Sequence, residues 1–101
     1  MKAELLFHQK IVLRHHVQNE LGIFEVIVWR VPKSRTYPDG VKYRAWLSMN
    51  GATIFGFDNH KPKGPHLHIG EKEMDYVYRG LAQLRVDILA LIDGAGFYYE
   101  K

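Results

Sequence analysis

The chain has no cysteine among its 101 residues. This absence excludes disulfide bonds, a thiolate nucleophile and any zinc site built on thiolates, and it fits a reducing compartment. Without cross-links, the fold must be stabilised by burial of apolar side chains. A hydrophobic content of 47% is sufficient for one core in a chain of this length.

The sequence also lacks an apolar run near the ~20 residues that a membrane-spanning helix needs. The first ten residues carry charges and a histidine where a secretion signal would have an uninterrupted apolar stretch. No internal repeat, low-complexity tract or linker interrupts the chain. We therefore expect a single domain over residues 1–101, located in the cytoplasm and not associated with a membrane.

Strong charge of either sign is missing as well. Fourteen Lys and Arg stand against eleven Asp and Glu, which gives a formal net charge of +3. Such a mild bias favours nucleic acid or another acidic partner only if the cations gather on one surface. The position of the charges therefore matters more than their sum.

What the sequence does contain is a series of strand patterns. Apolar and polar residues alternate over residues 3–17, whereas residues 23–31 are β-branched or aromatic on both parities, which is typical of a strand packed on two sides. Asn50-Gly51 is typical of a type I′ turn and predicts a tight hairpin, because both of its positions need positive φ. Further strands are expected over residues 41–49, 52–58 and 66–69, and the Pro- and Gly-rich segments 32–40 and 59–65 are expected to be loops.

The apolar spacing changes at Leu81. Leu84, Ile88 and Leu91 follow at helical intervals and Gly94 stops the pattern, which predicts a helix of about 14 residues. The apolar stripe of this helix is the natural cover for one face of a sheet. The sequence thus predicts an α+β fold, with a four- to five-stranded antiparallel β-meander and one C-terminal helix packed on one face.

An assumed register divides the strand side chains between two faces of the sheet. The face toward the helix is expected to hold Leu5, Ile11, Leu13, Ile27, Trp29, Tyr43, Ala45, Leu47, Phe55 and Phe57. The opposite face is expected to hold Lys10, Arg14, Arg30, Lys42, Arg44 and Asp58. That face would be basic, with one carboxylate whose ionised form the arginines favour. It is either an ordinary solvated surface or a binding surface.

Residues 57–70 concentrate groups that can exchange protons: three His, two Lys and one Asp. If residues 66–69 are extended, His66 and His68 point the same way while Leu67 and Ile69 point into the core. Imidazoles titrate near neutral pH, so such a pair can serve as general base and general acid. These parts suffice for metal-independent cleavage of RNA, in which a base activates the ribose 2′-hydroxyl and an acid protonates the leaving oxygen.

Two other interpretations of this segment stay open. His-x-His supplies two metal ligands from one strand, and Asp58 or His60 could complete an open site of three ligands. Alternatively, these histidines are ordinary surface or structural residues in a turn-rich hairpin.

Several short motifs resemble a known family. They are Val28-Trp29-Arg30-Val31-Pro32, Lys42-Tyr43-Arg44 and above all Gly56-Phe57-Asp58-Asn59, Lys63-Gly64 and His66-x-His68-Ile69-Gly70. In them the chain is similar to the small TumE-like proteins of bacteria and archaea, which are regarded as toxins of toxin–antitoxin pairs. The chain differs from the family pattern at Phe57, where the family often has Tyr, and in an additional His60.

The resemblance implies a cytoplasmic protein, a cognate antitoxin that is a helix-turn-helix protein, and an RNA target. Combined with the residue chemistry, it predicts a toxin that cleaves RNA without a metal or other cofactor. We expect His66, His68 and Asp58 to be catalytic, and Arg30, Arg44, Lys63 and Asn59 to bind substrate. The alternatives are a non-catalytic RNA- or protein-binding module that uses the basic sheet face, and a His/Asp metal-binding protein. An edge strand near the N-terminus could also pair with a partner or with a second copy in a homodimer.

Overall fold

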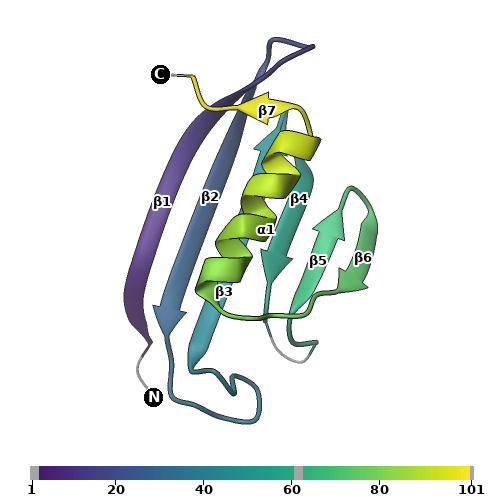
Figure 1. Cartoon of the computed structure of the whole chain (residues 1–101). Coiled ribbons are helices and arrows are strands. Elements are labelled where there is room, and N and C mark those ends of the chain that lie inside the picture. Colours follow the sequence, from purple (N-terminus) through teal and green to yellow (C-terminus); the bar gives the residue numbers. More distant parts are fainter. Residues whose placement is uncertain (1–2, 61–62, 101) are drawn as a thin grey trace.

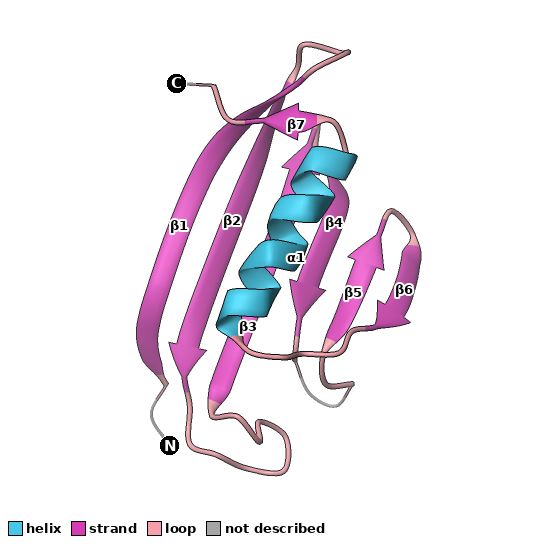
Figure 2. Ribbon diagram, viewed as in Figure 1, coloured by secondary structure: helices cyan, strands magenta, loops and turns pink. Residues whose placement is uncertain are grey.

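The computed structural model of the chain describes residues 3–60 and 63–100, so two positions of the predicted loop 59–65 lie outside the described residues. The described residues form one antiparallel sheet and one helix (Figures 1 and 2). In chain order the elements are β1 (Glu4–His15), β2 (Leu21–Arg30), β3 (Val41–Met49), β4 (Ala52–Asp58), β5 (His66–Ile69), β6 (Lys72–Asp75), α1 (Leu81–Gly94) and β7 (Phe97–Tyr98).

The sheet is a meander that curls into a half-barrel. Its strand order is β6-β5-β4-β3-β2-β1-β7, so each strand from β1 to β5 pairs with the next along the chain. The short strand β7 returns to pair with β1 at Arg14 and His15. Helix α1 crosses the concave face, in front of β3 and between β2 and β4 (Figure 1). The predicted meander with one C-terminal helix on one face is confirmed.

The predicted number of four to five strands is wrong, because the sheet has seven strands within residues 3–60 and 63–100. Strand β6 is exposed along its whole length, and β7 has only two residues. A strand that buries no side chains carries no apolar alternation, so the sequence pattern does not mark it. The first strand also ends at His15, two residues before the predicted boundary.

The strongest local signal, Asn50-Gly51, forms the expected turn. Both residues have positive φ, 54° and 76°, and they join β3 directly to β4. The hairpin sets the register that pairs Leu47 with Phe55 and Ala45 with Phe57. All four of these side chains are buried, so the turn fixes the centre of the core.

The core lies between the concave face of the sheet and α1. It contains Leu13, Phe24, Val28, Tyr43, Ala45, Leu47, Phe55, Phe57, Leu84, Ile88 and Phe97. The helix runs over the 14 predicted residues and contributes Leu84 and Ile88 to this core. In the described part of the chain, α1 is too short and too polar to cross a membrane.

Phe97 of β7 packs against Gly22 of β2 at one end of the core. The side chain is 3% exposed, and a Cβ atom added at Gly22 would lie 2.6 Å from its Cε1 atom. A side chain at position 22 would therefore force the ring to move. The absence of one lets the C-terminal segment pack directly on β2.

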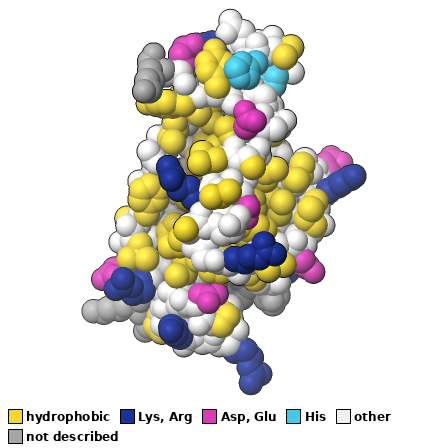
Figure 3. Space-filling model, in the orientation of Figure 1, with side chains coloured by type: hydrophobic (Ala, Val, Ile, Leu, Met, Phe, Trp, Pro, Cys, Tyr) yellow, Lys and Arg dark blue, Asp and Glu magenta, His cyan; other side chains and the backbone are white. Residues whose placement is uncertain are grey.

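Apolar side chains remain exposed on the helix side of the molecule (Figure 3). They line a groove of about 670 Å³ between α1 and strands β1 and β2. Leu6 and Phe7 form one wall, and Leu81 and Leu89 form the other. A β-bulge between Leu5 and Phe7 shifts the register with which this end of β1 pairs with β2.

The predicted division of side chains between the two faces is right for β3 and β4 and wrong for β2. Phe24, Val26 and Val28 pair with Leu47, Ala45 and Tyr43, so these β2 residues face α1. Ile27 and Trp29 therefore lie on the opposite face, as does Leu5, the partner of Trp29. Because residues 23–31 are apolar on both parities, alternation carries no signal there.

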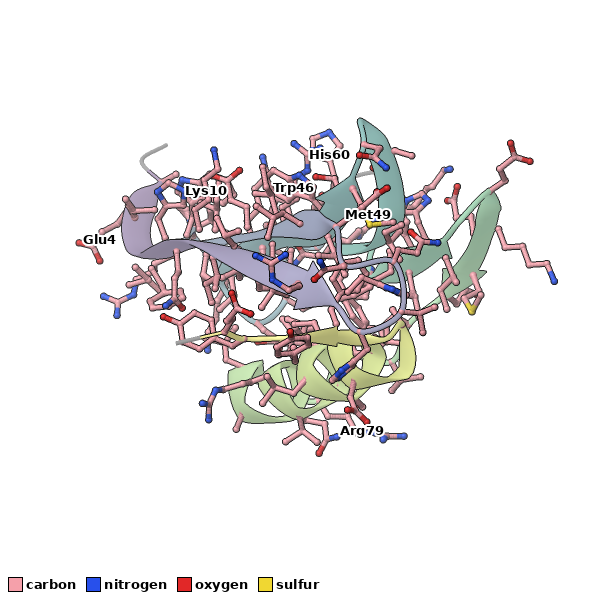
Figure 4. The ribbon with its side chains drawn as sticks, turned by 90° about the horizontal axis from the view of Figure 1, so that it is seen from above. Glu4, Lys10, Trp46, Met49, His60 and Arg79 are labelled. Carbon is pink, nitrogen blue, oxygen red and sulfur yellow. The ribbon has the colours of Figure 1, made fainter. Side chains whose placement is uncertain are left out.

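The same shift removes Arg30 from the predicted basic face. Arg30 shares the side of Val28 and pairs with Glu4, with 3.3 Å between Nη1 and Oε1. Lys10, Arg14, Lys42, Arg44 and Asp58 do lie on the face away from α1, as predicted. Lys10, Trp46 and His60 project from that side in Figure 4, whereas Arg79 lies on the helix side.

Candidate functional site

Pairing of β4 with β5 brings three predicted residues together. His66 lies opposite Asp58 and His68 opposite Gly56, so both imidazoles and the carboxylate emerge from the face away from α1. Leu67 points the other way and packs against the core. The predicted common direction of His66 and His68 is confirmed. Ile69 shares the side of Leu67 but remains 40% exposed, because it lies near the edge of the sheet.

Asp58 lies beside both imidazole rings. Its Oδ1 atom is 3.2 Å from His66 Nε2, and its Oδ2 atom is 3.9 Å from His68 Nε2. The ring centroids are 4.8 Å apart and the ring planes meet at 74°. One carboxylate can therefore contact a ligand that is bound by either ring.

His66 is held at the base of the site. Its side chain is 8% exposed, and Nδ1 donates a hydrogen bond of 2.7 Å to the carbonyl oxygen of Gly64. A carbonyl oxygen only accepts, so Nδ1 carries a hydrogen. In a neutral ring, Nε2 would then present a lone pair to the Asp58 carboxylate. Two lone pairs repel each other, so this contact calls for a proton or another cation between the two groups.

His68 is the more accessible imidazole. Its side chain is 37% exposed. Its nitrogens lie 3.9 Å from Asp58 and 4.0 Å from Glu73, beyond hydrogen-bond distance. A ligand entering from solvent can therefore reach a ring nitrogen of His68 without displacing a protein hydrogen bond.

Glu73 is a site residue that sequence reasoning missed. It lies on β6 opposite His68 in the register, 4.0 Å from a nitrogen of each imidazole. Lys63 Nζ donates to Glu73 Oε1 at 2.6 Å, and this hydrogen bond lowers the pKa of Glu73 below its usual value. The charge of Lys63 is thus largely offset. In the sequence, Glu73 is marked only by its place after the turn at Gly70 and close to another carboxylate, Asp75.

A pocket of about 530 Å³ opens beside His66. Its lining residues are Trp29, Lys42, Tyr43, Arg44, Asp58, His60, Lys63 and His66. Each of the two central cations lies over a tryptophan: Lys42 Nζ is 5.6 Å from the centroid of Trp29, and Arg44 Cζ is 4.2 Å from that of Trp46. A smaller hollow of about 280 Å³ adjoins His68 and also contacts Arg44. The site therefore combines imidazole, carboxylate, cation and aromatic surface.

The remaining predicted residues are placed differently from one another. Asn59 is 7% exposed, and its side chain accepts from the Tyr43 N–H (2.9 Å) and donates to the Val41 carbonyl (2.8 Å). These contacts tie the segment after β4 to β3 and give Asn59 a structural role. Arg30 lies on the far side of the sheet. Phe57, the departure from the family pattern, is 1% exposed in the core and does not line the pocket.

Replacing Asn59 with alanine is expected to lower the free energy of unfolding by about 2–4 kcal/mol. The change leaves a buried N–H and a carbonyl without partners, and each such loss costs about 1–3 kcal/mol. Chemical denaturation measures the difference. The neighbouring exposed residue provides a control, and His60→Ala should stay within about 0.5 kcal/mol of the unmodified protein. Equal stability of the two variants would contradict the structural role.

The geometry also suits a metal ion in part. One ligand atom from each of Asp58, His66 and His68 can be chosen so that all three lie within 4.8 Å of one another. His60, the other predicted third ligand, is not part of this group in the described part of the chain. Its backbone N–H instead donates to Asp58 Oδ1 at 3.1 Å.

Comparison with known proteins gives one family match. The model of the family described as "Toxin TumE" matches residues 2–95, which include the pocket and both histidines. No curated protein and no solved structure was found to match the chain. The family match and the site geometry are therefore the two grounds on which a function can be proposed.

Proposed function

Because the chain belongs to the TumE toxin family, we propose that it is the toxin of a toxin–antitoxin pair and that it cleaves RNA with His66, His68 and Asp58. The observation that carries this proposal is a pair of imidazoles with ring centroids 4.8 Å apart, which lie 3.2 and 3.9 Å from the oxygens of one carboxylate. The toxin acts in the cytoplasm, and its partner is a cognate helix-turn-helix antitoxin.

The accessibility of the two rings suggests their roles. His68, whose nitrogens make no hydrogen bond with the described residues, takes the proton of a ribose 2′-hydroxyl. The 2′-oxygen then forms a bond to the adjacent phosphorus. The bond from phosphorus to the 5′-oxygen breaks, and that oxygen receives the Nε2 proton of His66. The products are a 2′,3′-cyclic phosphate and a 5′-hydroxyl. At the end of the step His68 holds one proton more and His66 one proton fewer than before.

Asp58 and the cations support this transfer. Asp58 and the Gly64 carbonyl hold the ring of His66 in place, because each of them contacts one of its two nitrogens. Arg44 and Lys42 line the pocket and can stabilise charge on the phosphate. Lys63 is less suited to that role, because Glu73 already holds its ammonium group.

A metal-binding function is the second candidate. It is favoured by one observation, the His66 Nε2 atom directed at the Asp58 carboxylate with Nδ1 occupied by Gly64. A divalent cation on Nε2, Asp58 and His68 would satisfy that contact as well as a proton does. The two candidates differ in their response to a chelator.

Purified protein is expected to cleave single-stranded RNA and to leave 2′,3′-cyclic phosphate ends. A substrate with a single 2′-deoxyribose at the cleaved position should resist cleavage there, because the attacking oxygen is missing. EDTA should leave the rate unchanged. Mass spectrometry of the products and gel analysis of labelled RNA measure both results. Loss of cleavage in EDTA that zinc or manganese restores would favour the metal function instead, and cleavage at the deoxyribose position would contradict the mechanism.

A further inference from the structure

Trp29 is placed on the pocket side of the sheet by the pairing of β2 with β3. It lies opposite Lys42 in the register and shares the wall of the 530 Å³ pocket with Asp58 and His66. The side chain is half-buried, so one part of the indole is held by the sheet and another part is accessible. A rigid aromatic surface thus lies next to the two catalytic groups proposed above.

The chain has only two tryptophans, and both lie on this face of the sheet. The Arg44 guanidinium lies 4.2 Å from the centroid of Trp46, at the distance of a stacked pair, and covers a face of that ring. The Lys42 ammonium is 5.6 Å from the centroid of Trp29. A single ammonium on a flexible stem covers less of the ring and can move aside to a phosphate.

We propose that Trp29 is the stacking platform for one unpaired base of an RNA strand, and that Lys42 contacts the phosphate of the same nucleotide. The proposal takes RNA as the ligand from the proposed function, but it does not require that the RNA is cleaved. Aromatic side chains bind unpaired bases with little sequence preference, because every base has a π-face. A base inside a duplex is already stacked on its neighbours and cannot use the platform.

The dimensions and charges of the pocket agree with this ligand. A volume of about 530 Å³ falls within the usual range of about 300–1,000 Å³ for small-ligand pockets. Lys42, Arg44 and His60 line its polar side, and Trp29 lines its aromatic side. Trp29 shares this pocket with Asp58 and His66, so an RNA strand bound there would lie beside the proposed catalytic groups.

Two single-tryptophan variants test the platform by fluorescence. Trp46→Phe leaves Trp29 as the only tryptophan, and Trp29→Phe leaves Trp46. The probe is a 12-nucleotide, mixed-sequence RNA with 2′-O-methyl riboses, which the proposed mechanism cannot cleave. The RNA should quench the emission of Trp46→Phe strongly and that of Trp29→Phe weakly. Equal quenching of both variants would overturn the proposal.

Binding constants provide an independent readout. Trp29→Ala should weaken binding of the same oligonucleotide about 5- to 150-fold, whereas Trp46→Ala should change it less. Lys42→Ala should make binding less dependent on salt. The slope of log K against log salt concentration should fall by the amount that corresponds to the loss of about one phosphate contact. A duplex of the same sequence should compete poorly. Unchanged binding by a folded Trp29→Ala variant, or equal competition by the duplex, would contradict the platform.

The two proposals can fail separately. Quenching at Trp29 without cleavage of unmodified RNA would remove the catalytic function and keep the platform. Cleavage of unmodified RNA, together with unchanged binding by Trp29→Ala, would keep the catalytic function and remove the platform. If circular dichroism shows that Trp29→Ala does not fold, the quenching of Trp29→Phe still decides the matter. Binding of a protein partner with no affinity for RNA would overturn both.

Discussion

The His68→Ala variant is expected to lose RNA cleavage by a factor of about 10²–10⁴ while keeping its fold. The side chain is 37% exposed, and its nitrogens make no hydrogen bond with the described residues. Removal of the ring therefore costs little stability but deletes the group that we propose takes the 2′-hydroxyl proton. Expression from a repressed promoter, followed by growth curves and gels of total RNA, measures the loss in cells.

His8→Ala is the matched control. His8 lies on the same face of the sheet, its side chain is 46% exposed, and its Nε2 atom lies 2.6 Å from Glu25 Oε2. This variant should arrest growth as the unmodified protein does. Full toxicity of a His66→Ala/His68→Ala double variant would rule out the His-based mechanism, whatever the single variants do.

The variants His66→Ala and His68→Ala should differ in thermal stability, although both should lose activity. His66→Ala is expected to lose cleavage as His68→Ala does, because the acid is then missing. It should also melt at a lower temperature, since His66 is buried and bonded to Gly64 and Asp58. Differential scanning fluorimetry of both variants makes the comparison.

The largest effect on stability is expected from Phe57→Ala, which should lower the free energy of unfolding by about 3–5 kcal/mol. Phe57 is 1% exposed, and its ring contacts Phe55 and Tyr76 edge-on, with centroids 6.0 and 4.8 Å away. For a domain of about 100 residues this corresponds to a fall in Tm of about 12–40 °C. Many domains have only about 5–15 kcal/mol to lose, so the variant would be marginal at best.

Thermal and urea denaturation measure this loss. Phe7→Ala is the control, since Phe7 is 48% exposed on β1, and its removal should cost less than about 1 kcal/mol. A Phe57→Ala variant as stable as Phe7→Ala would contradict the position of Phe57 in the core. Because Phe57 precedes Asp58, cleavage should be lost above the lowered melting temperature.

Local signals predicted the centre of the molecule well. The Asn50-Gly51 turn and the helical spacing from Leu81 depend only on neighbouring residues, and both elements form as predicted. The common direction of His66 and His68 followed from the two-residue period of a strand. These features need no knowledge of the rest of the fold.

The missed features all depend on contacts between distant residues. Trp29 was assigned to the wrong face because its strand is apolar on both sides, and only pairing with Lys42 decides its direction. Glu73 joins the site through an exposed edge strand that has no apolar pattern. The role of Asn59 depends on two backbone groups of β3, sixteen and eighteen positions earlier in the chain.

The return of β7 to β1 has a consequence for synthesis. The ribosome makes β1 to β6 before α1 and β7, so the hairpin that carries Asp58, His66 and His68 can form while the concave face is still bare. Phe97 reaches its place beside Gly22 only when the C-terminal strand has been translated. The concave face of the sheet is therefore covered only after α1 and β7 have been translated, and the fully ordered fold exists only after translation of that last strand.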